Sequence, residues 1–404
     1  MSRKWLLVVG VLALAALFLV VTSGDDRAAE DPAANDRTPS TSQQSSGPDS
    51  AAPGPTTTTP DLAPVDPVTV DPGRAGPLLG RSVDAMLLLG GGESGWWVVD
   101  LTDNSARPAP VLDDVPASAI TPVRDGVALI NPVDAVPFVF PLTGAAGSGS
   151  PAPPRRLDTG THGDVVTGPA VLVLAGDGPD QVWVLHGSRR GSSAGLQATL
   201  VGIDGAVLAG PIDVPGTPVA ATSRSIVFDA AGRTFLASVD GIDAVGVGTT
   251  YDAAGGVVAR VVCDEEAQCA ESIHSLGTGT AAAGSSIPSQ VVSDERITMV
   301  LSAQGGLVTV SGFVPDLVPG FTPAATLRVT PPGGEPADID VPSIRAAPAW
   351  LPDGESLVVL TNIGLHHVSI EDGRWTGRRL EGIDVGDATS VFVIPRAEAQ
   401  VPTD

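Results

Sequence analysis

Residues 349–360 read "AWLPDGESLVVL", and this stretch decides the fold. Pro352 presets the backbone for a turn, and Gly354 can adopt the positive φ that such turns use. Leu357 then opens an apolar run typical of a buried strand. Trp350 and Asp353 complete the pattern of aromatic, Pro-Asp-Gly turn and strand, so the stretch predicts β structure around a tight turn.

Weaker versions of this pattern recur along the chain. Each holds an apolar run, a turn rich in Gly and Asp, and a second apolar run. Their starts lie about 40–50 residues apart, which is the period of a four-stranded propeller blade. The seven pieces cover residues 85–103, 117–144, 169–188, 218–241, 255–276, 295–313 and 347–375.

The clearest piece resembles the repeat of TolB-like and WD-repeat-like propellers, through Trp350, Pro352, Asp353, Gly354 and Leu357. A degraded echo, "FDAAGRTFLA", occupies residues 228–237. The resemblance implies a fold and no reaction, because propellers support many unrelated functions.

We therefore predict an all-β chain with a single β-propeller over residues 78–395. Seven blades fit best, and six is the alternative because residues 312–344 are hard to assign. Tandem β-sandwiches are the rival architecture, since they also use regularly spaced short strands. One period throughout, with no second linker near the middle, favours the propeller.

The N-terminus indicates export. After a tail at residues 1–4 that carries Arg3 and Lys4, "WLLVVGVLALAALFLVVT" runs for 18 residues without a charge, and acids follow it. This length just spans a bilayer core about 30 Å thick, and the charge asymmetry puts the N-terminus inside. We predict a transmembrane signal anchor at residues 5–23; the alternative is a signal peptide cleaved near residues 21–23, with secretion of the rest.

Low-complexity sequence flanks the predicted domain. Residues 24–77 are rich in Pro, Ser, Thr, Ala and Asp and include "PGPTTTTP", so too little apolar surface is present to offset chain entropy. We predict a disordered linker there and a disordered tail at 396–404.

The charge balance limits the partners. The chain has 46 acids against 22 bases, a formal charge of -24. Binding to nucleic acid or anionic lipid depends on Lys and Arg neutralising phosphates, so neither is an expected partner of the domain. Contact with the membrane is expected through the N-terminal helix only.

Both cysteines of the chain, Cys263 and Cys269, lie in "ARVVCDEEAQCAESIHS". The polar "DEEAQ" predicts a turn between two strands, which would set the cysteines opposite each other within reach of a disulfide. Export would preserve that bond. The alternatives are two free thiols, or a metal or redox site, although zinc and redox cysteines are usually closer in sequence.

Other motifs carry less weight, and we assign no catalytic, cofactor or metal residue. Ser193 lies in a G-x-S-x-G match that a strand follows instead of a helix. His366 and His367 are adjacent in a predicted strand and point to opposite faces; one could line the propeller face or channel, or both are ordinary polar surface. The pair Arg378–Arg379 could hold an anion or lie in a solvated loop.

The expected role is a non-enzymatic binding or scaffold module in the cell envelope, presented to another envelope protein or to a polymer. No cofactor is expected, and the sequence does not indicate an oligomeric state. The alternative is an exported enzyme, a polysaccharide lyase or hydrolase with its site at the channel mouth, which would need converging carboxylates or histidines.

Overall fold

The computed structural model describes residues 67–71, 74, 76–131, 133–143, 152–157, 169–187, 195–288, 291–292, 297–312 and 325–397. All belong to the compact unit formed by Ala63–Asp404. The predicted anchor at residues 5–23 lies outside the described residues. Within the described ranges, no helix is long and apolar enough to cross a membrane.

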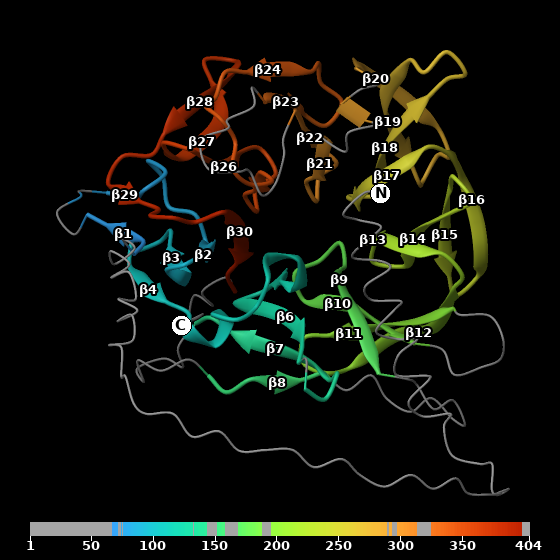
Figure 1. Cartoon of the computed structure of the whole chain (residues 1–404), viewed down its shortest axis with the longest axis horizontal. Coiled ribbons are helices and arrows are strands. Elements are labelled where there is room, and N and C mark those ends of the chain that lie inside the picture. The colour runs from blue at the N-terminus through green and yellow to red at the C-terminus, as the bar shows by residue number, and fades with distance from the viewer. Residues whose placement is uncertain are drawn as a thin grey trace, which may run out of the picture. The chain divides into compact units, whose positions relative to one another are not determined.

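Seven four-stranded antiparallel sheets surround a central axis, so the chain is a seven-bladed β-propeller (Figure 1). Blade 1 contains β30 (Ser390–Pro395), β2 (Ala85–Gly92), β3 (Gly95–Asp100) and β4 (Ala106–Pro108). Blade 2 contains β5 (Thr121–Val123), β6 (Gly126–Ile130), β7 (Pro137–Pro141) and β8 (Arg155–Arg156). Blade 3 contains β9 (Ala170–Ala175), β10 (Gln181–Gly187), β11 (Leu196–Gly202) and β12 (Val207–Val214). Two single-turn 3-10 helices, η1 (Pro110–Leu112) and η2 (Ala117–Ala119), connect blades 1 and 2.

The remaining blades follow in chain order. Blade 4 contains β13 (Thr217–Ala221), β14 (Ser225–Ala230), β15 (Arg233–Ser238) and β16 (Gly241–Val247). Blade 5 contains β17 (Thr249–Ala254), β18 (Val257–Cys263), β19 (Cys269–Ser275) and β20 (Ala281–Ile287). Blade 6 contains β21 (Ile297–Leu301), β22 (Leu307–Ser311), β23 (Thr326–Thr330) and β24 (Ala337–Ile339). Blade 7 contains β25 (Ala349–Trp350), β26 (Leu357–Thr361), β27 (Gly364–Glu371) and β28 (Arg374–Arg379).

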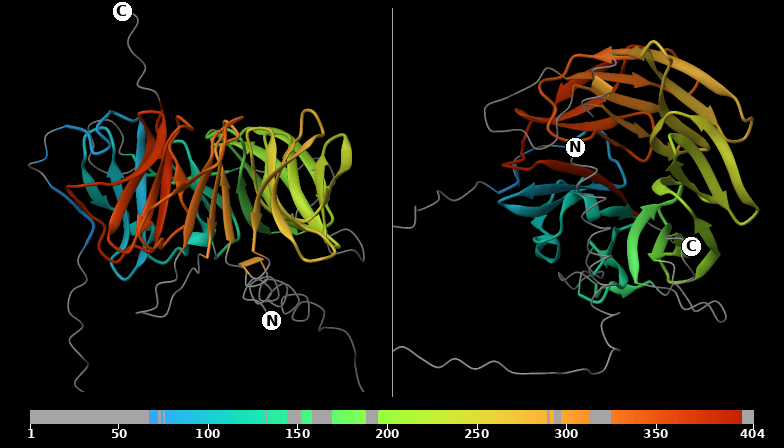
Figure 2. Two further views of the ribbon diagram at one scale, coloured as in Figure 1. Left: turned by 90° about the horizontal axis from the view of Figure 1, so that it is seen from above. Right: turned by 45° about the vertical axis from the view of Figure 1, so that its right-hand side comes forward.

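The predicted seven-bladed all-β fold is confirmed, and the six-blade and β-sandwich alternatives are wrong. The stretch that resisted assignment, residues 312–344, contributes β23 and β24 to blade 6. The first strand of each blade lies beside the axis and the fourth at the rim, and the blades stand side by side around the ring (Figure 2).

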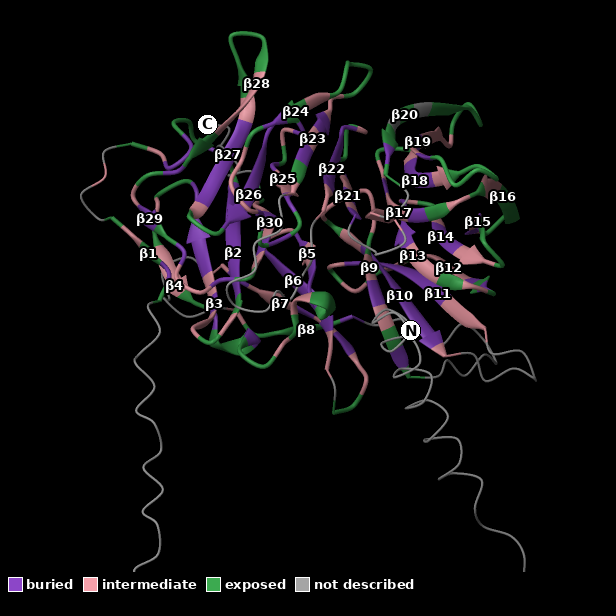
Figure 3. Ribbon diagram, turned by 45° about the horizontal axis from the view of Figure 1, so that its top comes forward, coloured by how far each residue is buried: buried purple, intermediate pink, exposed green. Residues whose placement is uncertain are grey.

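Each blade is packed on both faces, which explains why the inner strands are continuous apolar runs. In β26, Leu357 packs toward blade 6, whereas its neighbour Val358 packs toward blade 1. In β10, Val182 packs toward blade 2 and Trp183 toward blade 4. Successive side chains of a strand point to opposite faces, so a strand between two neighbouring blades must be apolar at every position. Figure 3 shows this burial along the inner strands and exposure at the hairpin turns.

The ring closes through both ends of the chain. The C-terminal β30 supplies the inner strand of blade 1 and pairs with β2 in continuous antiparallel register from Ala85 opposite Pro395 to Gly90 opposite Ser390. Closure therefore joins residues some 300 positions apart in sequence, and the pairing covers the inner edge of β2.

A second, shorter pairing reinforces this closure at the rim. Strand β1 (Thr69–Val70) pairs with β29 (Ile383–Asp384), and we call these two strands the strap. Val68, just before the strap, is 1% exposed in the core between blades 7 and 1. The structure thus places Val68–Val70 on the propeller, although the sequence predicted a linker up to residue 77. The physical reason is that the Val68 and Val70 side chains pack into the core between blades 7 and 1. Residues 24–66 lie outside the described part.

The C-terminal end also extends slightly beyond the predicted domain boundary. Arg396 donates from Nη1 to Asp100 Oδ2 at 2.7 Å, and its N–H donates to Asp84 O at 3.1 Å. The residue falls within the range predicted as tail, yet it is bonded to blade 1.

Specific polar contacts connect neighbouring blades. Trp96 Nε1 donates to Val115 O at 3.1 Å, Trp183 Nε1 to Thr222 O at 2.7 Å, and Trp350 Nε1 to Val300 O at 3.0 Å. These bonds give each buried indole N–H a partner. Trp183 and Trp350 thus bond directly to the neighbouring blade, whereas Trp96, in the third strand of blade 1, bonds to the segment that leads to blade 2.

The disulfide joins Cys263 at the end of β18 to Cys269 at the start of β19. The two residues are directly opposite in the ladder, with Cα atoms 4.0 Å apart. Asp264 caps the turn between them: its N–H donates to Gln268 O at 3.0 Å, and its Oδ1 accepts the Gln268 N–H at 2.7 Å. The predicted hairpin disulfide is therefore confirmed.

Removing this disulfide should destabilise blade 5. For a closed loop of seven residues, the chain-entropy relation gives roughly 2.4 kcal/mol of stabilisation. We expect the double variant Cys263→Ser/Cys269→Ser to lose up to about 2 kcal/mol in the free energy of unfolding, measured by denaturant titration. Reductant should destabilise the wild type by a similar amount and leave the variant unchanged. An intact mass that does not rise by about two daltons on reduction would show that the bond is absent.

Asp252 should make stability depend on pH. Its carboxylate joins blade 5 to blade 6 by accepting the Leu301 N–H at 2.7 Å. The carboxyl group of Asp252 is enclosed, although the residue as a whole is only half-buried. This burial raises the pKa of the carboxyl group to about 6, and the hydrogen bonds from the Leu301 and Ala253 N–H groups, which lower the pKa, offset the effect only in part. The unfolded pKa is about 3.9, so between these values only the folded state binds the proton.

We therefore expect Asp252 to stabilise the fold least above pH 6. The free energy of unfolding of the wild type, relative to Asp252→Asn, should fall by at most about 3 kcal/mol as pH rises from acid through 6. Paired denaturant titrations between about pH 4.5 and 7 measure this difference. A constant difference across that range would contradict an enclosed, titrating carboxyl group.

Candidate functional site

Two cavities flank blade 7, beside the place where the ring closes. The first, of about 570 Å³, lies between the strap and the end of blade 7, and we call it the strap cleft. The second, of about 470 Å³, lies between the segment before β2 and the other end of blade 7, and we call it the histidine cleft. Both are lined by arginines in a chain whose net charge is strongly negative.

The blade side of the strap cleft presents Arg345 and Arg379. Arg345 follows Ile344, which forms a β-bridge with Thr361 at the end of β26. The Arg345 N–H donates to Leu360 O at 2.8 Å. Ile344 is buried against blade 6, so the exposed side chain of Arg345 points away from that core. Arg379 ends β28 and is also exposed.

The Arg379 side chain lies beside Gly364, at the turn between β26 and β27. The φ of Gly364 is +123°, and an added Cβ would lie 3.4 Å from Arg379 Nε, which is an ordinary contact distance. A side chain at this position would be strained by the backbone conformation. The turn also carries Asn362 and Ile363 into the cleft.

The strap forms the opposite wall. Thr69 is paired with Asp384, so their side chains share one face of the two-stranded ladder, and both line the cleft. The Asp71 N–H donates to Gly382 O at 2.9 Å, and Arg74 Nη1 donates to Glu381 O at 2.6 Å. These bonds fix the chain just after β1 against the segment that leads into β29.

The histidine cleft is built around the Pro-Asp-Gly turn. Asp353 Oδ1 accepts the N–H groups of Glu355 at 2.9 Å and Ser356 at 3.1 Å, while Oδ2 is paired with Arg81 from the segment before β2. Burial tends to raise the pKa of Asp353, but the Glu355 N–H and Arg81 outweigh it, so the pKa lies below its usual range. Gly354 adopts φ +65°, and a Cβ there would overlap the Gln304 side chain of blade 6.

His367 lies at the buried side of this second cleft. It is 6% exposed and stands opposite Arg378 in the ladder. Its Nε2 is buried and, among the described residues, has no hydrogen-bond partner. Burial lowers the pKa of His367, and the charges of Arg81 and Arg378 lower it further, against the weaker influence of Asp353 and Glu371. The imidazole is therefore neutral at pH 7.

His366 points to the other face of the same strand. It is 4% exposed, and its Nδ1 lies 3.3 Å from Thr361 Oγ1. Burial and the charge of Arg379 lower its pKa, and a backbone bond with Gly364 opposes them. The expected opposite orientation is thus observed, but the surface alternative is wrong for both histidines, because a strand inside blade 7 is covered on each side.

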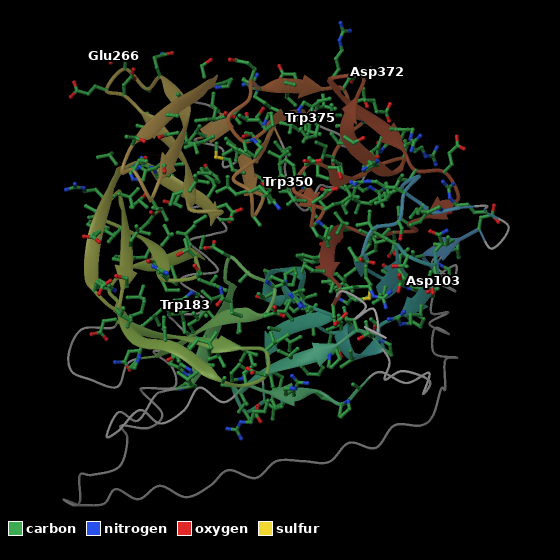
Figure 4. The ribbon with its side chains drawn as sticks, turned by 180° about the vertical axis from the view of Figure 1, so that it is seen from behind. Asp103, Trp183, Glu266, Trp350, Asp372 and Trp375 are labelled. Carbon is green, nitrogen blue, oxygen red and sulfur yellow. A yellow bond between two sulfur atoms is a disulfide. The ribbon has the colours of Figure 1, made fainter. Side chains whose placement is uncertain are left out.

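The structure separates the predicted site residues into two groups. The blade-motif residues Trp350, Pro352, Asp353, Gly354 and Leu357 form the turn beside the histidine cleft, and Trp350 packs against Trp375 with ring centroids 6.4 Å apart (Figure 4). The disulfide lies in blade 5, away from both clefts. Ser193 lies outside the described residues. Arg378 and Arg379 are in β28 and not in a loop, so each one reaches a different cleft.

Sequence reasoning missed Arg81 and Arg345. Each is a lone arginine in an irregular segment. Only the folded ring brings Arg81 to blade 7, whereas Arg345 lies just before β25 and is held by pairing with the nearby β26. Within the described part of the chain, no group of three or more His, Cys, Asp or Glu side chains is placed to hold a metal ion.

Comparison with known proteins adds the following. No protein-family model and no curated protein matches the sequence. Among solved structures, the chain resembles an oligogalacturonate lyase from Vibrio parahaemolyticus, with a TM-score of 0.47 and 8% identity over 77% of this chain and 93% of that one. It also resembles a 6-phosphogluconolactonase-like protein from Bacteroides uniformis, with a TM-score of 0.45 and 12% identity over 77% and 100%. Similarity at this level supports no statement about activity.

The buried histidines should destabilise the fold in acid. The folded pKa of His367 is below the unfolded value of about 6.5, so below that pH the unfolded state binds more protons and the free energy of unfolding falls. In denaturant titrations from about pH 7.5 to 5, His367→Gln should lose stability less steeply than the wild type. Identical pH profiles would show that His367 is freely protonated in the folded state.

Proposed function

We propose that this chain is a membrane-anchored, extracytoplasmic propeller that acts as a non-enzymatic binding module in the cell envelope. The disulfide is the main observation that supports an extracytoplasmic location, because such bonds persist outside the reducing cytosol. The uncharged segment at residues 5–23 after Arg3 and Lys4 supports the same orientation. The likeness of residues 349–360 to TolB-like and WD-repeat-like repeats fits an exported propeller of this kind.

The binding role rests on the clefts at the ring closure. A propeller supplies a rigid frame, and the loops and strand ends on it form the recognition surface. Here exposed arginines line two clefts, while the nearby histidines are buried and neutral. This arrangement suits the recognition of an anionic or polar group more than proton transfer. An exported lyase or hydrolase is the alternative, and turnover of an envelope polymer by the purified chain would favour it.

The location can be tested through the unusual lysine content. Lys4 is the chain's one lysine, so amine reagents have no lysine target in the propeller. We expect Val133→Cys, at a position that is 91% exposed, to react with a cell-impermeant maleimide on intact cells. Lys4→Cys should react only after permeabilisation, and the disulfide leaves the wild type unlabelled. Labelling of Val133→Cys that also requires permeabilisation would overturn the proposed location.

A further inference from the structure

The two exposed arginines of the strap cleft lie near its opposite ends. Arg345 is on the segment that pairs with β26 at the axis side of blade 7, and Arg379 is on β28 at the rim. Strands β26 and β27 lie between them, so their backbones are three strand spacings apart, about 14 Å. The cleft therefore runs across the end of the blade and is longer than a pocket for a single small ion.

Both guanidiniums are available to a ligand. Among the described residues, neither Arg345 nor Arg379 has a side-chain hydrogen bond or an ion pair with a carboxylate, in contrast to Arg81, Arg124, Arg328 and Arg396. Asp384 on the strap wall instead accepts the Gly386 N–H at 3.0 Å. The donors of the two arginines thus face an open cleft in solvent.

Polar groups on the walls of the cleft are of the kind that bind hydroxyls. Thr69 supplies a hydroxyl group, Asn362 an amide, and Asp384 a carboxylate, whereas the Thr361 hydroxyl is buried and already donates to Gly364 O at 2.8 Å. A carboxylate accepts hydrogen bonds from hydroxyl groups and repels a second anion. The cleft therefore combines two arginines that favour a negative group with polar side chains that favour a neutral, hydroxylated one.

We propose that the strap cleft binds an extended anionic glycopolymer, with Arg345 and Arg379 each holding a carboxylate or phosphate group and the sugar hydroxyls meeting Thr69, Asn362 and Asp384. The guanidinium presents a planar fork of donors that matches either oxyanion. This proposal names a ligand class for the proposed binding module, and it rests on the proposed function for its location in the cell envelope.

Other occupants fit less well. A folded protein partner would cover about 800 Å² on this side, whereas the cleft is a narrow trough between the strap and one blade. A nucleic acid carries a phosphate at every residue and would meet Asp384 and the strongly negative field of the chain. Because that field opposes every anion, each contact should be weak alone, and several repeats should be needed for firm binding.

The test is calorimetric titration of the full chain in detergent micelles. The probes are a soluble polyuronate, a poly(glycerol phosphate), inorganic phosphate and neutral dextran. We expect one of the two polyanions to bind, which also identifies the anion as carboxylate or phosphate. Arg345→Gln and Arg379→Gln should each weaken that binding about tenfold or more, and the double variant should abolish it.

Arg374→Gln is the matched control. Arg374 is an exposed arginine at the other end of β28 and does not line the strap cleft. Its substitution should change the affinity by no more than about twofold. Thermal unfolding of each variant checks that the fold is intact.

Three results would overturn the proposal: no binding of either polyanion to the wild type, equal binding by the double variant, or inorganic phosphate binding as tightly as the polymer. The last would reduce the cleft to a site for a small ion. None of these results bears on the compartment, which the maleimide experiment tests separately. Conversely, a propeller found in the cytosol would defeat the proposed function and leave the titration unaffected.

Discussion

The antiparallel pairing of β30 with β2 is the constraint on which the rest of the structure depends. Each blade buries both faces against its neighbours, so an open arc would leave two large apolar faces in water. Leu87 and Leu89 of β2 pack on one side with blade 7, and Met86 and Leu88 pack on the other with blade 2. Because blade 1 takes its inner strand from the opposite end of the chain, the contacts of β2 with β30 and with blade 7 form only when the ring is closed.

Closure also creates the functional surface. Strand β1 and the segment carrying Arg81 come before blade 1 in the chain, whereas β29 and blade 7 come near its end, and the two parts meet only at this junction. The core cluster that contains Val68 and Leu78 anchors the N-terminal segment there. The same burial that closes the ring thus fixes the positions of the arginines that line both clefts, which places recognition on a rigid part of the molecule.

The sequence predicted the fold well where the signal was local. The Pro-Asp-Gly turn, the hairpin disulfide and the repeat period are all set by residues close to one another in the chain. Local sequence could not assign β23 and β24, because a stretch of irregular composition separates β23 from its partner β22. It also placed the start of the domain after the strap, since two residues paired with β29 carry no periodic pattern of their own.

The candidate site was less predictable for the same physical reason. Arg378 and Arg379 were noticed as an adjacent pair, yet their separation onto two faces of β28 follows from the strand that contains them. Arg81 reaches blade 7 only through long-range packing, and Arg345 faces β1 only once the ring has closed. The buried state of His366 and His367 required knowing that blade 7 is covered on both sides.

The most direct test of this account is hydrogen exchange on the full chain, followed in peptides that cover residues 390–395 and 85–90. If the two chain ends close the ring, these amides should exchange as slowly as those of the corresponding strands β21 and β22 of blade 6, and they should lose protection together with them as denaturant is added. Rapid exchange at residues 390–395, while the inner strands of the other blades stay protected, would show that the ring is open and would contradict the account.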